Sequence, residues 1–180
     1  VLSSLAGSSQ ISISMWVNPD GQTDYNGLFA SRSESSAGSW SLAWEGGNHL
    51  DFHTSGAGNQ LDSANGITTG AWWHVLAVWD NDTGNRSVFI NGDPAGTGLS
   101  TTNTFTGGVN FVGDGSWDIG SDDCCTDRDF DGLIDDVGVF DTALTAADAK
   151  TIFDAGNAGA NVAGVRTASR RAICAICLAV

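Results

Sequence analysis

The sequence predicts an all-β domain built from antiparallel strands. Glycine is abundant, with 24 residues in a chain of 180, and Ser, Thr and Asn are frequent. This composition favours short strands joined by tight turns. Apolar runs bounded by turn residues recur at roughly ten-residue spacing, which is typical of a two-sheet sandwich or jelly roll. The apolar content of 41%, with 7 Trp and 8 Phe, is enough for one core.

The first expected strand covers residues 11–17, with the sequence ISISMWV. Alternation places one set of its side chains on one face and a second set on the other: Ile11, Ile13, Met15 and Val17 against Ser12, Ser14 and Trp16. A turn is expected at residues 18–21, where Asn, Pro, Asp and Gly follow one another. Similar short strands are expected at residues 27–31, 40–44 and 50–54.

The run WWHVLAVWD at residues 72–80 is apolar on both faces. It predicts a strand that is covered on both sides, with Trp73 and Trp79 in the core. Residues 86–94 should pair with this strand as an antiparallel hairpin, and within them Asn91 and Gly92 match a two-residue hairpin turn.

One helix is expected, over residues 145–156. Thr145 is the expected N-cap, Asp148 follows three residues later, and Gly156 would end the helix. We therefore predict a domain over residues 1–156. Residues 157–180 lack a periodic pattern and are treated as a C-terminal extension.

The net charge of −14 comes almost wholly from Asp, since Glu34 and Glu45 are the only glutamates and Lys150 is the only lysine. Such a surface repels phosphate backbones, so nucleic acid is not an expected partner.

No run of 18 apolar residues is present, so no membrane span is expected. The sequence opens at Val1 without a signal peptide, and we expect a processed product or a piece of a longer polypeptide.

Alternating aspartates ahead of a glycine allow two interpretations, a calcium loop or turn residues before a strand. They are Asp127, Asp129 and Asp131. An EF-hand is excluded, because its twelfth position would be Gly138 and a strand pattern follows instead of a helix. A looser calcium loop stays open beside plain turn capping. Asp135 lies at the strand entrance in line with apolar neighbours, where a carboxylate needs backbone donors or a cation.

Four stretches carry a family resemblance by their order along the chain. They are ISISMWVNP (11–19), GAWWHVLAVWDNDTGNRSVFINGDP (70–94), WDIGS (117–121) and FDGLIDDVGVFDTALTAADAKTIF (130–153). Together they resemble laminin-G-like domains of the concanavalin A-like lectin/glucanase superfamily, in particular bacterial jelly-roll modules of secreted proteins. The resemblance implies an antiparallel two-sheet jelly-roll sandwich with one short helix near the C-terminal end. It also implies that Asp135 is a calcium ligand, and that one edge strand is absent or supplied from elsewhere.

The sequence does not predict an enzyme. Glucanases of that superfamily carry a Glu-x-Asp-x-Glu strand, because a retaining glycosidase needs two carboxyl groups roughly 5 Å apart. No such strand is present, and a Glu–Asp pair across strands leaves glycoside hydrolysis as a minor alternative. His49, His53 and His74 have no metal-binding spacing.

Binding of a glycan or cell-surface polysaccharide is the function expected instead. Aromatic side chains at a jelly-roll surface stack on the apolar faces of sugars. The candidates are Trp44, Trp72 and Trp117, each near a loop and next to polar or acidic residues. We predict a non-catalytic extracellular carbohydrate-binding or adhesion module, stabilised by Ca²⁺ at Asp127, Asp129, Asp131 and Asp135. The alternative is a structural building block of a surface layer, filament or virion that uses the same fold for subunit contacts.

The four cysteines stand in two pairs, Cys124 with Cys125 and Cys174 with Cys177. Adjacent cysteines seldom bridge each other. Two disulfides are therefore expected between the loop that holds Cys124 and Cys125 and the C-terminal tail that holds Cys174 and Cys177, in either of the two pairings. Disulfides favour an extracellular location. A four-thiolate zinc site is the alternative.

The tail at residues 172–180 is apolar and able to form a strand. It follows Arg166, Arg170 and Arg171 in an otherwise acidic chain. An exposed apolar strand tends to be covered, so the tail should pack against its own domain or a neighbouring subunit. The second arrangement would be self-association through the termini.

Overall fold

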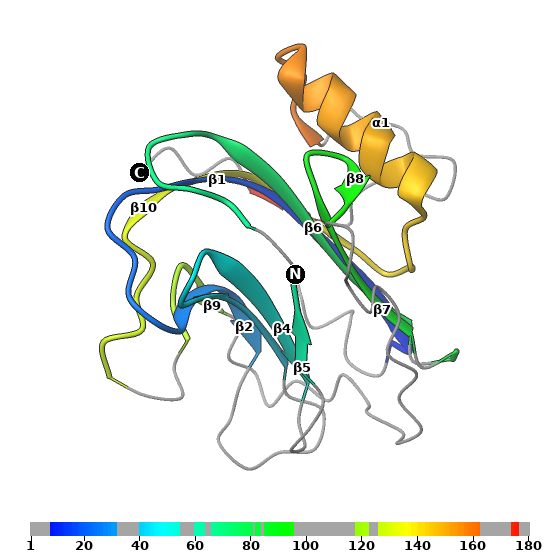
Figure 1. Ribbon diagram of the computed structural model, residues 1–180. Coiled ribbons are helices and arrows are strands. Elements are labelled where there is room, and N and C mark those ends of the chain that lie inside the picture. Colours follow the sequence, from blue (N-terminus) through cyan, green and yellow to red (C-terminus); the bar gives the residue numbers. More distant parts are fainter. Residues whose placement is uncertain are drawn as a thin grey trace.

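The described part of the chain forms two β-sheets and one helix (Figure 1). The structure is a computed structural model that describes residues 8–31, 40–54, 60–63, 66–80, 82–83, 85–95, 118–122, 126–162 and 174–176. The strands of the first sheet are β1 (Gln10–Pro19), β6 (Trp73–Asp80), β7 (Asn85–Ile90), β8 (Asp93–Pro94), β10 (Gly132–Phe140) and β11 (Cys174–Ile176). Those of the second are β2 (Asn26–Ser31), β3 (Trp40–Glu45), β4 (His49–Thr54), β5 (Gln60–Asp62) and β9 (Asp118–Ile119). Helix α1 spans Ala146–Asn157.

The first sheet has six strands in the order β11-β10-β1-β6-β7-β8, and the second has five in the order β5-β4-β3-β2-β9. Neighbouring strands within each sheet pair antiparallel. The two sheets lie one above the other, and α1 lies on the outer side of the six-stranded sheet (Figure 1). The predicted all-β jelly-roll sandwich with one short helix is confirmed.

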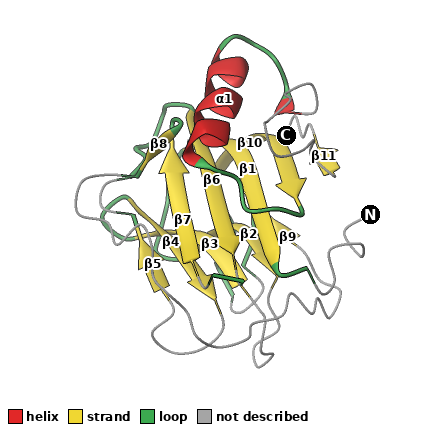
Figure 2. Cartoon of the chain, turned by 90° about the vertical axis from the view of Figure 1, so that its right-hand side faces the viewer, coloured by secondary structure: helices red, strands yellow, loops and turns green. Residues whose placement is uncertain are grey.

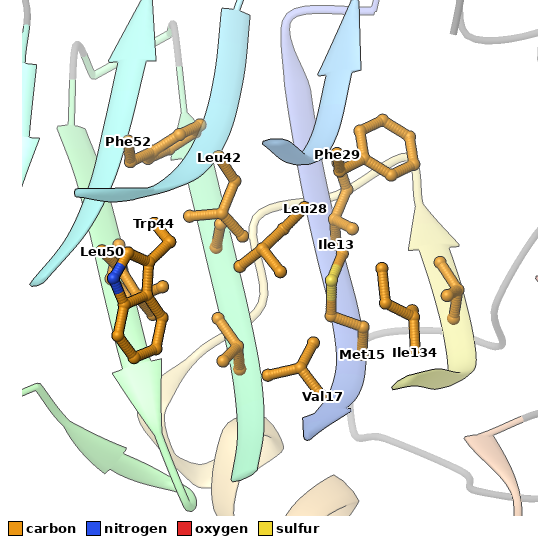
Figure 3. Close-up of a cluster of buried hydrophobic side chains, with 14 of the residues drawn as sticks. Ile13, Met15, Val17, Leu28, Phe29, Leu42, Trp44, Leu50, Phe52 and Ile134 are labelled. Carbon is orange, nitrogen blue, oxygen red and sulfur yellow. The ribbon is translucent and has the colours of Figure 1, made fainter. Parts of the chain in front are cut away.

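The side chains between the two sheets form the main core (Figure 3). Strand β1 contributes the inward set expected from its alternation, and Met15 and Val17 are completely buried. Trp44 of β3 belongs to the same core and is 4% exposed. The prediction that Trp44 faces a ligand is therefore wrong, because the alternation of β3 places it on the same face as Leu42.

A second apolar cluster lies between the outer face of the six-stranded sheet and α1 (Figure 2). Leu76 and Val78 of β6 pack there with Ala149 and Ile152 of the helix. The opposite face of β6, with Trp79, belongs to the main core. This arrangement explains why the run at residues 72–80 is apolar on both faces.

The predicted hairpins are also present. Strands β6 and β7 pair antiparallel, with Asp80 opposite Asn85. Strands β7 and β8 are joined by Asn91 and Gly92, whose φ angles are 52° and 79°. Two consecutive positive φ angles are what a type I′ turn needs, and Asn followed by Gly is the pair that adopts them most readily.

Helix α1 begins as predicted and ends later than predicted. Thr145 and Asp148 form a capping box, in which each side chain accepts a hydrogen bond from the backbone N–H of the other. At the other end Gly156 lies inside the helix, and Gly159, with φ +84°, follows the cap. The N–H of Gly159 donates to the carbonyl of Gly156, and that of Ala160 donates to Ala155. These two bonds make a Schellman motif, so Gly159 is the glycine that ends the helix.

The extension contributes to the sandwich in its described parts. Strand β11 pairs with β10, with Val139 opposite Cys174 and Val137 opposite Ile176. The prediction that the tail packs against its own domain is confirmed for these residues. Cys124, Cys125 and Cys177 lie outside the described residues, so the disulfides stay a prediction. Among the described residues no helix is both long and apolar enough to cross a membrane.

Candidate functional site

A cavity of about 530 Å³ opens on the outer side of the six-stranded sheet, beside the C-terminal end of α1. Its volume is in the range of small-molecule sites. The functional groups around it come from Trp16, Trp72, Asp135, Asp136, Asn157 and Asn161. The cavity thus brings together two residues that the sequence had nominated separately, Trp72 and Asp135.

Trp16 is a half-buried indole held from two sides. On one side it stacks on Phe153 of α1, with ring centroids 5.7 Å apart and an angle of 26° between the planes. On the other it packs at 5.5 Å against His74, its cross-strand neighbour on β6. Trp72 precedes β6 and is 44% exposed. Of the two indoles that line the cavity, that of Trp16 is therefore held by its neighbours, and that of Trp72 is exposed.

His74 supports Trp16 as a neutral side chain. It is fully buried, and its Nε2 lies 2.9 Å from the hydroxyl oxygen of Ser14, which is also buried. Burial lowers the pKa of His74 from 6.5 to about 4, because a charged imidazole would lose its hydration there. At neutral pH the ring beneath Trp16 is therefore uncharged.

A β-bulge places the two carboxylates. Trp16 lies opposite Asp135, whereas Ser14 lies opposite Gly138, so β1 has one residue where β10 has two. Asp136, the first of those two, has φ 51°. A bulge bends its strand and redirects side chains, which is why bulges recur beside functional sites.

Asp136 holds the segment that follows the helix. Its two carboxylate oxygens accept hydrogen bonds from the backbone N–H of Val162, at 2.8 and 2.7 Å. Burial raises the pKa of Asp136, the bond from Val162 lowers it, and the neighbouring charge of Asp135 raises it further, with a net increase. The side chain of Asp136 is thus occupied in positioning residues 157–162.

Asp135 is exposed, in contrast to the buried Asp136. Its Oδ1 accepts one hydrogen bond from the N–H of Asp136 at 2.7 Å, and its Oδ2 has no partner among the described residues. The exposed amide of Asn157 likewise has no hydrogen-bond partner there. An accepting oxygen and a side-chain amide therefore remain available to a ligand.

The end of α1 forms the remaining wall. A Cβ atom on Gly156 would lie 2.5 Å from Nε1 of Trp16, so only glycine allows the helix to approach the indole this closely. The Schellman motif then turns the chain so that Asn157 and Asn161 both border the cavity. Two glycines thus serve different purposes, one for close packing and one for the turn.

The aspartate loop before β10 is held mainly through its backbone. The N–H of Asp20 donates to the carbonyl of Asp131 and that of Gly27 to the carbonyl of Arg128, both at 2.9 Å. Asp127 and Asp129 are exposed.

Within the described part of the chain no three His, Cys, Asp or Glu side chains gather to hold a metal ion. Asp127, Asp129, Asp131 and Asp135 therefore do not fit a calcium site built from three or more of their carboxylates. Calcium binding remains a prediction from the sequence. Trp117 lies outside the described residues.

A second, smaller cavity of about 270 Å³ lies on the outer side of the five-stranded sheet. Arg128 borders it, with Nη1 3.3 Å from a carboxylate oxygen of the buried Asp122 and its guanidinium 4.7 Å from the ring centre of Tyr25. Asp51 and His53 of β4 also border it. This cavity is polar and lacks a tryptophan among its described residues.

Sequence reasoning missed Trp16, Asp136, Asn157 and Asn161. Trp16 did leave a signal, because it is the one aromatic residue on the polar face of an otherwise regular strand. The two asparagines left none, since a turn rich in Gly, Ala and Asn has no pattern that points to a site.

Solved structures share this fold. A proposed carbohydrate-binding protein from Bacteroides ovatus is 18% identical, with a TM-score of 0.69 over 94% of this chain and 45% of that one. Domain 4 of AbnA, an extracellular arabinanase from Geobacillus stearothermophilus, was solved with arabinotriose. It is 28% identical, with a TM-score of 0.57 over 81% of this chain and 67% of that one. The CBM40 of a Ruminococcus gnavus sialidase, bound to α2,3-sialyllactose, is 13% identical, with a TM-score of 0.61 over 79% of this chain and 81% of that one.

The chain spans less than half the length of the Bacteroides ovatus protein. The search among curated proteins gave no match. A family model of the laminin G type, described as concanavalin A-like lectin/glucanases superfamily, matches residues 2–150. This match covers most of the chain and agrees with the two-sheet jelly roll, so the chain belongs to the concanavalin A-like lectin/glucanases superfamily.

Proposed function

We propose that this chain is a non-catalytic carbohydrate-binding module that binds a glycan in the cavity beside α1. The observation that carries the proposal is the meeting of two indoles and an available carboxylate, from Trp16, Trp72 and Asp135, in one cavity.

The chemistry of these groups suits a sugar. The C–H faces of a pyranose or furanose ring are apolar, and an indole offers a large flat surface for them. Hydroxyl groups at the ring edge need hydrogen-bond partners. The free oxygen of Asp135 accepts from a hydroxyl, and the amide of Asn157 both donates and accepts. A few polar groups set around aromatic surface is the usual composition of a small-molecule site.

Relatives of the same fold support this choice. The arabinanase domain was solved with arabinotriose, and the sialidase module with sialyllactose. The arabinanase is extracellular, and we extend that setting to this chain as part of the proposal.

Binding without cleavage is the expected mode. A glycosidase needs two carboxyl groups that flank the bond to be cut. Asp136 already accepts hydrogen bonds at both oxygens from Val162, and it follows Asp135 directly in the strand. The pair does not offer two carboxyl groups free to reach opposite sides of a glycosidic bond.

A glycan array followed by calorimetry with the best ligand tests the proposal. Trp72→Ala should weaken binding by about two- to tenfold, because a lost aromatic contact is worth about 0.5–1.5 kcal/mol and 1.4 kcal/mol is tenfold. The matched control is Tyr25→Asn, which removes an exposed ring beside the other cavity at a position, φ 66°, that Asn tolerates.

Equal affinities of Trp72→Ala and the unmodified chain would contradict binding in this cavity. Release of reducing ends from the bound glycan, abolished in Asp135→Asn, would contradict the non-catalytic mode.

A further inference from the structure

We infer that the cavity beside α1 selects neutral sugar units and rejects units that carry a carboxylate. The inference rests on the proposed glycan binding and specifies the charge of the glycan that the cavity accepts. It concerns Asp135 and Asp136, which line the cavity together with Trp16 and Trp72.

The described lining of the cavity contains carboxylates and no Lys or Arg side chain. The described cations lie elsewhere. Lys150 is on the exposed surface of α1, where its Nζ lies 2.9 Å from Asp154. Arg128 pairs with Asp122 at the second cavity, and Arg86 is buried inside the sandwich. Among the described residues, no positively charged side chain is therefore available in the cavity beside α1 to pair with the carboxylate of a sugar.

Asp135 makes the selection sharper because of the kind of bond it can form. An ionised carboxylate accepts hydrogen bonds and cannot donate them. A sugar hydroxyl can donate to the free Oδ2 of Asp135, whereas a second carboxylate in that place has no proton to offer. Two like charges about 4 Å apart near a protein surface should weaken binding by roughly tenfold or more.

The fold by itself does not settle the charge of the ligand. The sialidase module that binds sialyllactose, an acidic sugar, has the same fold at 13% identity. Charge selectivity has to come from the residues that border a particular cavity, and here they are acidic.

The test compares matched ligands that differ only in charge. We would use the methyl ester of 3′-sialyllactose against 3′-sialyllactose, which differ by one charge, and the full methyl ester of a galacturonic acid trimer against the free acid. Any neutral glycan found on an array would be paired in the same way with its uronic acid form. The unmodified chain should bind the neutral member of a pair about tenfold or more tightly at low salt. The preference should shrink as ionic strength rises, because the Debye length falls from about 30 Å at 0.01 M to about 8 Å at 0.15 M.

Two variants assign the effect to Asp135. Asp135→Asn keeps an oxygen for the N–H of Asp136 and removes the charge, so the ratio of neutral to acidic affinity should fall by about fivefold or more. Asp93→Asn removes one exposed negative charge from β8, outside the cavity, and should leave the ratio unchanged.

The possible outcomes distinguish a failure of glycan binding from a failure of charge selection alone. If no glycan binds, or if binding ignores Trp72→Ala, the proposed function itself fails. If neutral and acidic members bind equally in a manner sensitive to Trp72→Ala, glycan binding stands and the charge selection is wrong. Tighter binding of the acidic member that disappears when Arg166, Arg170 and Arg171 are changed to Gln would also overturn the selection, because the tail would then supply the counter-charge.

Discussion

Trp16 on β1 and Asp135 on β10 are direct cross-strand partners, and the register of the two strands breaks immediately beyond them. Because β10 has an extra residue at this point, Asp136 adopts a positive φ and turns its carboxylate to the N–H of Val162. One irregularity in the sheet thus places an indole beside an available carboxylate. The same irregularity fixes the chain after α1, which forms the facing wall.

Replacing Asp136 with alanine should lower the free energy of unfolding by roughly 3 kcal/mol. The lost hydrogen bonds to a charged acceptor contribute about 1.5–3 kcal/mol, and Ala at positive φ costs about 1–2 kcal/mol. Urea unfolding measures the change through the midpoint, provided that the slope stays the same.

The control for Asp136→Ala is Asp127→Ala. Asp127 also has a positive φ, 65°, but it is exposed and makes no described side-chain hydrogen bond. Its replacement should show the backbone cost alone. Equal losses in the two variants would mean that the bonds to Val162 contribute nothing.

Changing Gly156 to alanine should damage binding more than stability. The new Cβ would collide with Nε1 of Trp16, so the indole has to move within the cavity wall. Glycan affinity should fall about fivefold or more, as expected for the loss of roughly 1 kcal/mol of aromatic contact. The better helix propensity of Ala, worth about 1 kcal/mol, offsets part of the clash.

Thr151→Ala is a suitable comparison for Gly156→Ala, because Thr151 is exposed on the same helix and is not among the residues that line the cavity. Calorimetry and tryptophan fluorescence should both report a change for Gly156→Ala only. An unaltered affinity with altered fluorescence would show that Trp16 does not contact the ligand.

Strand alternation was sufficient to predict most of the fold. It assigned Met15 and Val17 to the core and explained β6 as a strand covered on both faces. It also contained the answer for Trp44, which shares the face of Leu42 in β3. The prediction erred there because proximity to a loop was given more weight than the period of two, which is the stronger physical constraint.

The site could be predicted only in part, since its geometry depends on contacts between distant segments. That Trp16 meets Asp135 is a matter of register between strands more than a hundred residues apart, and a bulge leaves no clear mark in the sequence. Gly156 was interpreted as a helix end because glycine has that meaning most often. Its actual reason is an aromatic ring on another strand.

The capping box of α1 should contribute measurably to stability. Thr145→Ala removes the side-chain oxygen that accepts from the N–H of Asp148, which should cost about 1 kcal/mol in urea unfolding. Thr145→Ser keeps the oxygen and should recover most of the loss. If Ser and Ala variants are equally destabilised, the loss comes from the methyl group of Thr145 and not from the cap.

Acidification should destabilise the fold through His74. The pKa of His74 is lowered from 6.5 to about 4 in the folded chain, so the folded state binds a proton less readily than the unfolded chain does. The stability from this group is fully present above pH 6.5 and is lost as the pH falls toward 4. With each pKa unit worth about 1.36 kcal/mol, the loss amounts to roughly 3 kcal/mol.

The measurement is the free energy of unfolding between pH 7.5 and pH 4.5, in the unmodified chain and in His74→Gln. Glutamine can still hydrogen-bond Ser14 but does not titrate in this range, so the variant should be less stable at pH 7.5 and lose less on acidification. The difference between the two curves isolates His74 from the carboxylates, which titrate in both. Parallel curves across the whole range would mean that His74 is not held neutral by burial beneath Trp16.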